Sequence, residues 1–206
     1  MGVAARLKDG RRVNLFSPAD VENEFLRPVG FGALMGLLKN YDVVNPFVNS
    51  TNDSLNRLKP GYEAPVCTVT SLGHSAKMPS RNRTVLVGLV RQIGNTMATR
   101  FELRSPNPKS NTYLVLAASY MAMLDGIKEA LEHSKTPAEL EQSISKEYGE
   151  EDFYLEKDRM YRSEKDVFDE YTADERDEFF GRAPRTVWEN LKAFDEHADK
   201  LAIFKR

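Results

Sequence analysis

Two arginines flank one carboxylate in the segment ATRFELR, residues 98–104. The alternation of apolar and charged residues predicts a β-strand, which places Arg100, Glu102 and Arg104 on one face, about 7 Å apart. One interpretation is an ion-paired outer face of a sheet, which contributes little to stability. The other is a polyanion site, because guanidinium groups grip phosphate and carboxylate in bidentate fashion and a carboxylate can hold a bridging divalent cation.

A second isolated carboxylate, Glu63, lies between two prolines in the segment RLKPGYEAPV, residues 57–66. Proline breaks helices and cannot donate to a strand ladder, so we expect a stiff loop here. From Arg57 to Lys109 the chain has nine Lys or Arg and only two acids, Glu63 and Glu102. This imbalance favours an anionic ligand in the middle of the chain.

The overall composition is that of an ordinary soluble protein, with 41% apolar and 29% charged residues among 206. A net charge of −2 gives no electrostatic argument for nucleic acid. No apolar run approaches the roughly 18 residues of a membrane-spanning helix. Cys67 is the single cysteine and the first residues lack a secretory signal. We therefore expect a cytoplasmic protein without a nucleic-acid or membrane partner.

The elements around these residues predict an α+β fold. Alternating or Val-rich stretches indicate antiparallel strands, separated by a loop at 72–82. These strands are expected at about residues 66–71, 84–93 and 98–104.

Helix signals surround the strands. Ser17-Pro18 is a typical helix start, and apolar residues at helical spacing continue to about Asn40. Residues 41–64 are rich in turn formers. Further helices are predicted at 111–131, 136–148 and 184–201, the second of them capped by Thr136-Pro137-Ala138-Glu139. Between the last two lies a charged and aromatic-rich segment, which we expect to be irregular or in short helices.

Four segments, taken in their order along the chain, resemble the glutamine synthetase family. They are RLKPGYEAPV at 57–66, SRNR at 80–83, RFELRSPNP at 100–108 and NTYLVLAASYMAMLDGI at 111–127. The resemblance covers roughly residues 7–131 and the closing helix at 187–201. It implies the C-terminal half of that family's catalytic domain.

The resemblance implies a reaction and its partners. In this family ATP phosphorylates the side-chain carboxylate of glutamate, and ammonia then displaces phosphate from the acyl phosphate. ATP and Mg²⁺ or Mn²⁺ are the implied cofactors. The implied partners are glutamate, ammonia and further copies of the chain, because family members form hexameric rings that are often doubled.

The resemblance also assigns substrate-side roles. Glu63 corresponds to the flap glutamate that closes over the site and helps to deprotonate ammonium. Arg57 and Arg104 correspond to arginines that contact the glutamate substrate. Because an acyl phosphate must be kept from water, a lid of this kind suits the chemistry.

On the nucleotide side, Arg83 corresponds to a catalytic arginine that faces the transferred phosphate, and Arg100 to a nucleotide-binding arginine. Glu102 corresponds to a ligand of the metal that bridges the ATP phosphates. Phosphoryl transfer depends mostly on positioning and charge stabilisation, which arginines and a metal provide.

Several positions depart from the family pattern. The stretch Asp53–Asn56 before the flap differs, and the loop before SRNR is several residues longer than in common bacterial forms. Those forms often have another arginine where this chain has Gly88, and Arg91 is a candidate replacement. His74, His133 and His197 match no metal-binding position and are interpreted as structural or surface residues.

The departures lead to an expected organisation of three parts: a partial catalytic domain at 1–148, an insert at 149–183 and a closing helix at 184–206. The paired metal glutamates and the metal histidine of the family are not among these residues. We therefore expect the chain to be inactive alone and to self-associate through an uncovered face. Two alternatives stay open: a γ-glutamyl-amine ligase of the same family, and a non-catalytic oligomer-forming piece.

Overall fold

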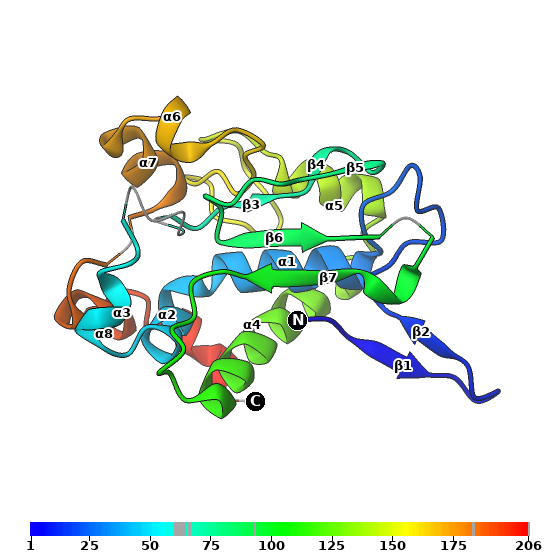
Figure 1. The fold of residues 1–206 in the computed structure, drawn as a ribbon, viewed down its shortest axis with the longest axis horizontal. Helices are drawn as coiled ribbons and strands as arrows, with labels where there is room; N and C mark the ends of the chain where they lie inside the picture. The colour runs from blue at the N-terminus through cyan, green and yellow to red at the C-terminus, as the bar shows by residue number, and fades with distance from the viewer. Residues whose placement is uncertain (60–64, 66, 93, 183, 206) are drawn as a thin grey trace.

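A small sheet lies against one long central helix in the computed structural model, which describes residues 1–59, 65, 67–92, 94–182 and 184–205 (Figure 1). The sheet has the order β3 (Thr70–Ser71), β6 (Val87–Val90), β7 (Arg100–Leu103). The β6–β7 pair is antiparallel, as predicted, whereas β3 pairs with β6 in parallel. The α+β architecture that the sequence predicts is confirmed.

The predicted strand at 66–71 is shorter in the structure because only Thr70 and Ser71 pair with β6. The other edge of β3 is occupied by a segment from much later in the chain. Thr70 donates its N–H to the carbonyl of Tyr161 at 2.8 Å, and Ser163 donates to the carbonyl of Thr70 at 2.9 Å. Local alternation cannot reveal this long-range pairing.

The central helix α1 (Pro28–Lys39) begins ten residues later than predicted from Ser17-Pro18. A helix through Pro28 would lose a backbone hydrogen bond and would clash with the carbonyl four residues earlier, whereas proline is favoured in the first turn. Ser17 is instead buried, and Arg27 donates its backbone N–H to the carbonyl of Phe16. Phe25 and Leu26 still enter the core, but from an irregular segment.

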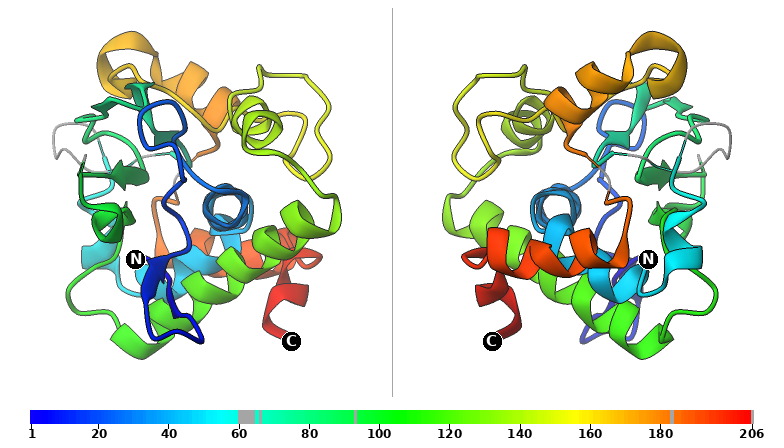
Figure 2. Two further views of the ribbon diagram at one scale, coloured as in Figure 1. Left: turned by 90° about the vertical axis from the view of Figure 1, so that its right-hand side faces the viewer. Right: turned by 90° about the vertical axis from the view of Figure 1, so that its left-hand side faces the viewer.

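Helix α4 (Thr112–Glu132) matches the predicted helix at 111–131, and the side chain of Asn111 caps its first turn. It crosses α1 at very short range (Figure 2). A Cβ added to Gly126 would lie 2.2 Å from the carbonyl oxygen of Gly32, and one added to Gly36 would lie 2.2 Å from that of Ala122. Glycine is therefore required at this crossing for steric reasons.

The residues between α1 and the flap segment are more helical than predicted. They form α2 (Tyr41–Val48) and α3 (Asn52–Leu55), although Pro46 lies inside α2. Tertiary contacts outweigh the turn propensity, since Val43, Val44 and Val48 are fully buried. The expectation of turns throughout 41–64 is wrong for these residues.

Two hairpins complete the strands. One, β1 (Ala4–Arg6) with β2 (Arg12–Asn14), extends away from the body of the molecule in Figure 1. The other, β4 (Gly73–Ser75) with β5 (Met78–Pro79), occupies the predicted loop at 72–82. A short 3₁₀ turn at Thr96–Ala98 leads into β7.

The C-terminal third forms short helices: α5 (Pro137–Ile144), α6 (Val167–Glu170), α7 (Ala173–Phe180), α8 (Val187–Glu196) and a final 3₁₀ helix at Lys200–Lys205. Thr136 and Glu139 cap α5 reciprocally, as the sequence predicted. The segment 149–183 is not confined to the surface, because Tyr154, Leu155 and Tyr161 join the main hydrophobic core. Among the described residues, no helix is long and apolar enough to cross a membrane.

Candidate functional site

The face of β7 turned away from α1 carries the charged row that the sequence predicts. Phe101 is 1% exposed and packs into the core, whereas Arg100 and Glu102 are exposed on the other side. An Nη1–H of Arg104 donates to Oε1 of Glu102 at 3.2 Å, and Arg100 donates to the carbonyl of Ala98 at 3.0 Å. The row borders an open cavity of about 370 Å³ between β7 and α4, lined in part by Arg100 and Glu102.

Gly88 lies directly opposite Glu102 in the β6–β7 register. A Cβ at this position would meet no atom of the described residues within 4 Å, so among these residues the space opposite Glu102 is open. Arg91 does not fill it: its guanidinium donates to the carbonyls of Ala76 at 3.2 Å and Val21 at 2.7 Å. The hypothesis that Arg91 replaces an arginine at position 88 is therefore not supported.

Arg57 reaches the end of β7 from the segment after α3. Its Nη1 donates to the carbonyl oxygens of Ser105 at 3.2 Å and Pro106 at 3.1 Å. These are the two residues that follow Arg104, so the structure brings Arg57 to the end of the charged row. Glu63 lies outside the described residues.

Arg83 lies at a different place, in the loop that joins β5 to β6. Together with Arg81 and Lys77 it lines an open cavity of about 980 Å³ between this loop and the β4–β5 hairpin. Val90 lines both this cavity and the one beside β7, so the two adjoin at the end of β6. The predicted phosphate-side arginines, Arg83 and Arg100, therefore border neighbouring cavities.

The described residues do not make a metal site by themselves. Glu102 offers one carboxylate, with 57% of its side chain exposed and an arginine as its ion-pair partner. No group of three His, Cys, Asp or Glu residues in the described part of the chain lies close enough together to hold a metal ion. Because hard cations require several oxygen ligands, Glu102 can be only one member of a larger set.

The histidines lie apart from the charged row. His133 ends α4 and contacts the carbonyl of Glu129, whereas His74 is exposed on the β4–β5 hairpin. His197 lies 3.8 Å from Asp42, in a buried ion network with Arg159 and Lys200.

Glu164, which the sequence does not mark as a functional residue, joins the segment 149–183 to the β4–β5 hairpin. Its carboxylate accepts backbone N–H groups from Leu72 at 3.0 Å and Gly73 at 2.9 Å, the hydroxyl of Ser71, and Nε–H of Arg162 at 2.9 Å. Burial alone would raise the pKa of Glu164, but these hydrogen bonds more than offset it and hold the pKa below its ordinary value. The backbone and hydroxyl donors lie more than 90 positions earlier, so no local pattern could indicate them.

Comparisons with known proteins agree on one family. The family model described as "Glutamine synthetase, catalytic domain" matches residues 5–199. A glutamine synthetase of Clostridium saccharobutylicum is 43% identical over 141 residues, which cover 66% of this chain and 27% of that protein. One of Rhizobium meliloti is 36% identical over 146 residues, which cover 66% of this chain and 29% of that protein.

A solved structure supports the same fold. The cryo-EM structure of Plasmodium falciparum glutamine synthetase superimposes with a TM-score of 0.61 at 19% identity, covering 98% of this chain and 39% of that one. The chain thus spans less than a third of the length of these curated relatives.

Proposed function

Because the chain belongs to the glutamine synthetase catalytic-domain family, we propose that it supplies part of the active site of a ligase that joins ammonia to the side-chain carboxylate of glutamate. The observation that carries the proposal is the charged row of Arg100 and Glu102, exposed on β7, and the partly buried Arg104 directly after it, with Arg57 at its end. The three guanidinium groups of Arg57, Arg100 and Arg104 suit a substrate that bears carboxylate and phosphate charges.

The amino acid occupies the end of the row where Arg57 and Arg104 meet. In the described structure the Arg57 guanidinium is anchored to two backbone carbonyls, which fixes its position without neutralising its charge. Arg104 is 16% exposed, so its guanidinium is partly shielded from water and interacts more strongly with a carboxylate. Glu63, on the flap segment, closes over the bound substrates and accepts a proton from ammonium.

The nucleotide phosphates occupy the other end, between Arg100 and Arg83. Positive charge there stabilises the phosphoryl group as it moves from ATP to the glutamate carboxylate. A divalent cation, when bound, would neutralise phosphate charge, and Glu102 would contribute one oxygen ligand to it. We also propose that the enzyme is cytoplasmic and works as a homo-oligomer.

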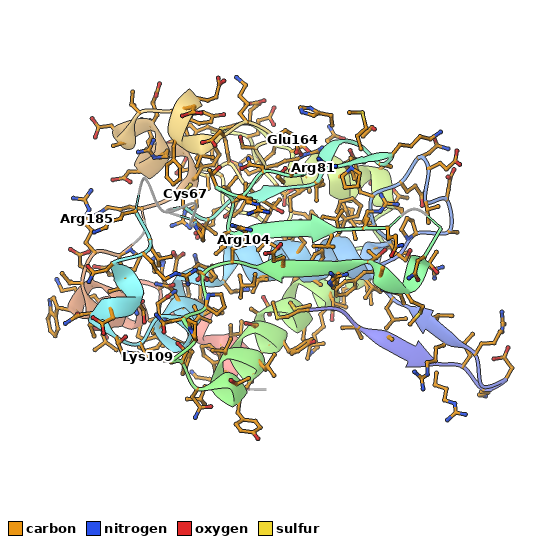
Figure 3. All side chains as sticks on the ribbon, viewed as in Figure 1. Cys67, Arg81, Arg104, Lys109, Glu164 and Arg185 are labelled. Carbon is orange, nitrogen blue, oxygen red and sulfur yellow. The ribbon has the colours of Figure 1, made fainter. Side chains whose placement is uncertain are left out.

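Ligand titration of the 206-residue chain, followed by NMR chemical shifts, tests this assignment. Arg100→Lys should weaken ATP binding about tenfold and Arg104→Lys should weaken L-glutamate binding about tenfold, because lysine cannot replace a bidentate contact. Arg185→Lys is the matched control, since Arg185 is 71% exposed and lies far from the row in Figure 3. Equal binding of both ligands by all four proteins would contradict the proposal.

The isolated chain should form no glutamine from ATP, glutamate, ammonium and Mg²⁺, because the described residues supply one carboxylate of the metal site. Robust glutamine formation by the chain alone would show that the site is complete within it.

A second candidate is a ligase of the same family that uses a larger amine. The space around Gly88, which is open among the described residues and lies opposite Glu102, favours this second candidate, because common bacterial members of the family often have an arginine at this position. Comparison of ammonium with alkylamines, in a preparation that contains the whole catalytic domain, separates the two. A strong preference for ammonium would exclude the second candidate.

A further inference from the structure

The loop of residues 80–84, which carries Arg81 and Arg83, has no regular secondary structure and is held by side chains. The Ser80 hydroxyl accepts the backbone N–H of Asn82 at 3.0 Å. The Asn82 side-chain oxygen accepts the N–H of Thr84 at 2.9 Å and its hydroxyl at 2.7 Å. These bonds fix the backbone on both sides of Arg83.

Both ends of this loop are attached to the segment 161–167. At one end, the Ser80 hydroxyl bonds to that of Ser71, which in turn bonds to the carboxylate of Glu164. At the other end, Thr84 accepts the N–H of Val167 at 3.1 Å. Between them, the Asn82 side chain donates to the carbonyl of Lys165 at 2.6 Å.

Glu164 is suited to anchor this support network, which we define as Ser71, Ser80, Asn82, Thr84 and Glu164. Only 15% of its side chain is exposed, and Arg162, which pairs with it, also donates to the carbonyl of Gly73 at 3.0 Å. Both carboxylate oxygens are occupied: Oε1 by Leu72 and Arg162, Oε2 by Ser71 and Gly73. The carboxylate is therefore fixed relative to the sheet.

The support network lies next to the cavity of about 980 Å³ that Arg83 lines, and Ser80, Asn82, Thr84 and Glu164 line that cavity too. Figure 3 labels Glu164 and Arg81, another residue that lines it. We propose that Glu164 is a positioning residue for Arg83: through Ser71 and Ser80 it holds the 80–84 loop so that the Arg83 guanidinium meets a phosphate group. The inference rests on the proposed function and gives the segment 149–183 a role in it.

Glu164→Gln is the informative substitution. It replaces one acceptor oxygen by an N–H₂ group, which faces N–H or O–H donors in either orientation of the amide and leaves at least one of them without an acceptor. The matched control is Glu170→Gln, which changes an exposed acid of the same segment whose Oε2 lies 3.5 Å from Nζ of Lys165.

The test is a double-mutant cycle on the 206-residue chain, with inorganic pyrophosphate as the probe and isothermal titration calorimetry as the measurement. Glu164→Gln should raise the Kd for pyrophosphate about tenfold, whereas Glu170→Gln should change it less than about twofold. In the Arg83→Ala background, Glu164→Gln should have almost no further effect, because its action passes through Arg83.

Two results would overturn the inference in distinguishable ways. If Glu164→Gln weakens binding equally in both backgrounds, or in neither, Glu164 has only a structural role and the proposed function stands. If the parent chain does not bind pyrophosphate, or Arg83→Ala binds it unchanged, Arg83 does not face a phosphate and the proposed function itself fails at this position.

Discussion

Lys200 offers the sharpest test of how the C-terminal third is held to the rest of the chain. Its side chain is 4% exposed, and its Nζ lies 2.7 Å from Oδ2 of Asp42 and 2.8 Å from Oε1 of Glu156. These partners lie in α2 and in the segment 149–183, so one ammonium group joins three parts of the sequence. Lys200→Met keeps most of the volume and removes the charge.

The expected cost follows from what the substitution leaves behind. Removal of one member of a buried ion network costs about 3–5 kcal/mol, because the remaining charges lose part of their compensation. Asp42 and Glu156 are only partly buried, with 16% and 32% of their side chains exposed, which favours the lower end of that range. Arg159 still lies 3.3 Å from Asp42 and 3.4 Å from Glu156, which also favours the lower end of that range. A loss of about 3 kcal/mol corresponds to a fall in Tm of about 6–12 °C for a chain of this size.

Urea unfolding followed by far-UV circular dichroism measures this loss. Trp188 is 68% exposed, which makes its fluorescence a poor reporter of the core. Lys205→Met is the control, since Lys205 is exposed in the same 3₁₀ helix and its loss should change stability by less than about 0.5 kcal/mol. A loss below about 1 kcal/mol for Lys200→Met would refute the reasoning and would mean that water screens the network.

The pH dependence provides a second check. Burial alone would raise the pKa of Asp42 and of Glu156, but Arg159 and Lys200 more than offset it, and both pKa values lie below the ordinary 3.8 and 4.5. The stability from these carboxylates is therefore present above those ordinary values and is lost as the pH falls through the lowered ones. The difference between the parent chain and Lys200→Met should shrink below about pH 4.

Three further predictions concern other parts of the fold. Gly126→Ala should destabilise the chain by about 1–3 kcal/mol or more in urea unfolding, because its Cβ would overlap α1, whereas Gly88→Ala, with open space, should be near neutral. Cys67 is buried and burial raises its pKa to about 12, so iodoacetamide should label it only after unfolding; rapid labelling at pH 8 would contradict its burial. The chain should self-associate in light scattering through the apolar face of α4, where Leu124 is 46% exposed, and Leu124→Lys should reduce the association; a monomeric parent chain would refute this.

Local sequence signals predicted the elements whose causes are local. The helix at 111–131 and the capping box at Thr136 depend on residues within one or two turns of each other, and both are confirmed. The alternation in ATRFELR likewise predicts which side chains of β7 face outward, because the strand period is two. The predicted start of α1 at Ser17-Pro18 is wrong, because two Pro residues compete as helix starts and the helix begins at the second, Pro28.

Only the tertiary structure decided how these parts meet. The ordered motifs identified the family and the charged row, but the place of Arg91 and the open space at Gly88 depend on strand register and on carbonyls far away in sequence. The same holds for Glu164, whose acceptor oxygens serve donors from β3 and the hairpin. A sequence records which groups can form hydrogen bonds, whereas the fold sets the distances that decide which of them do.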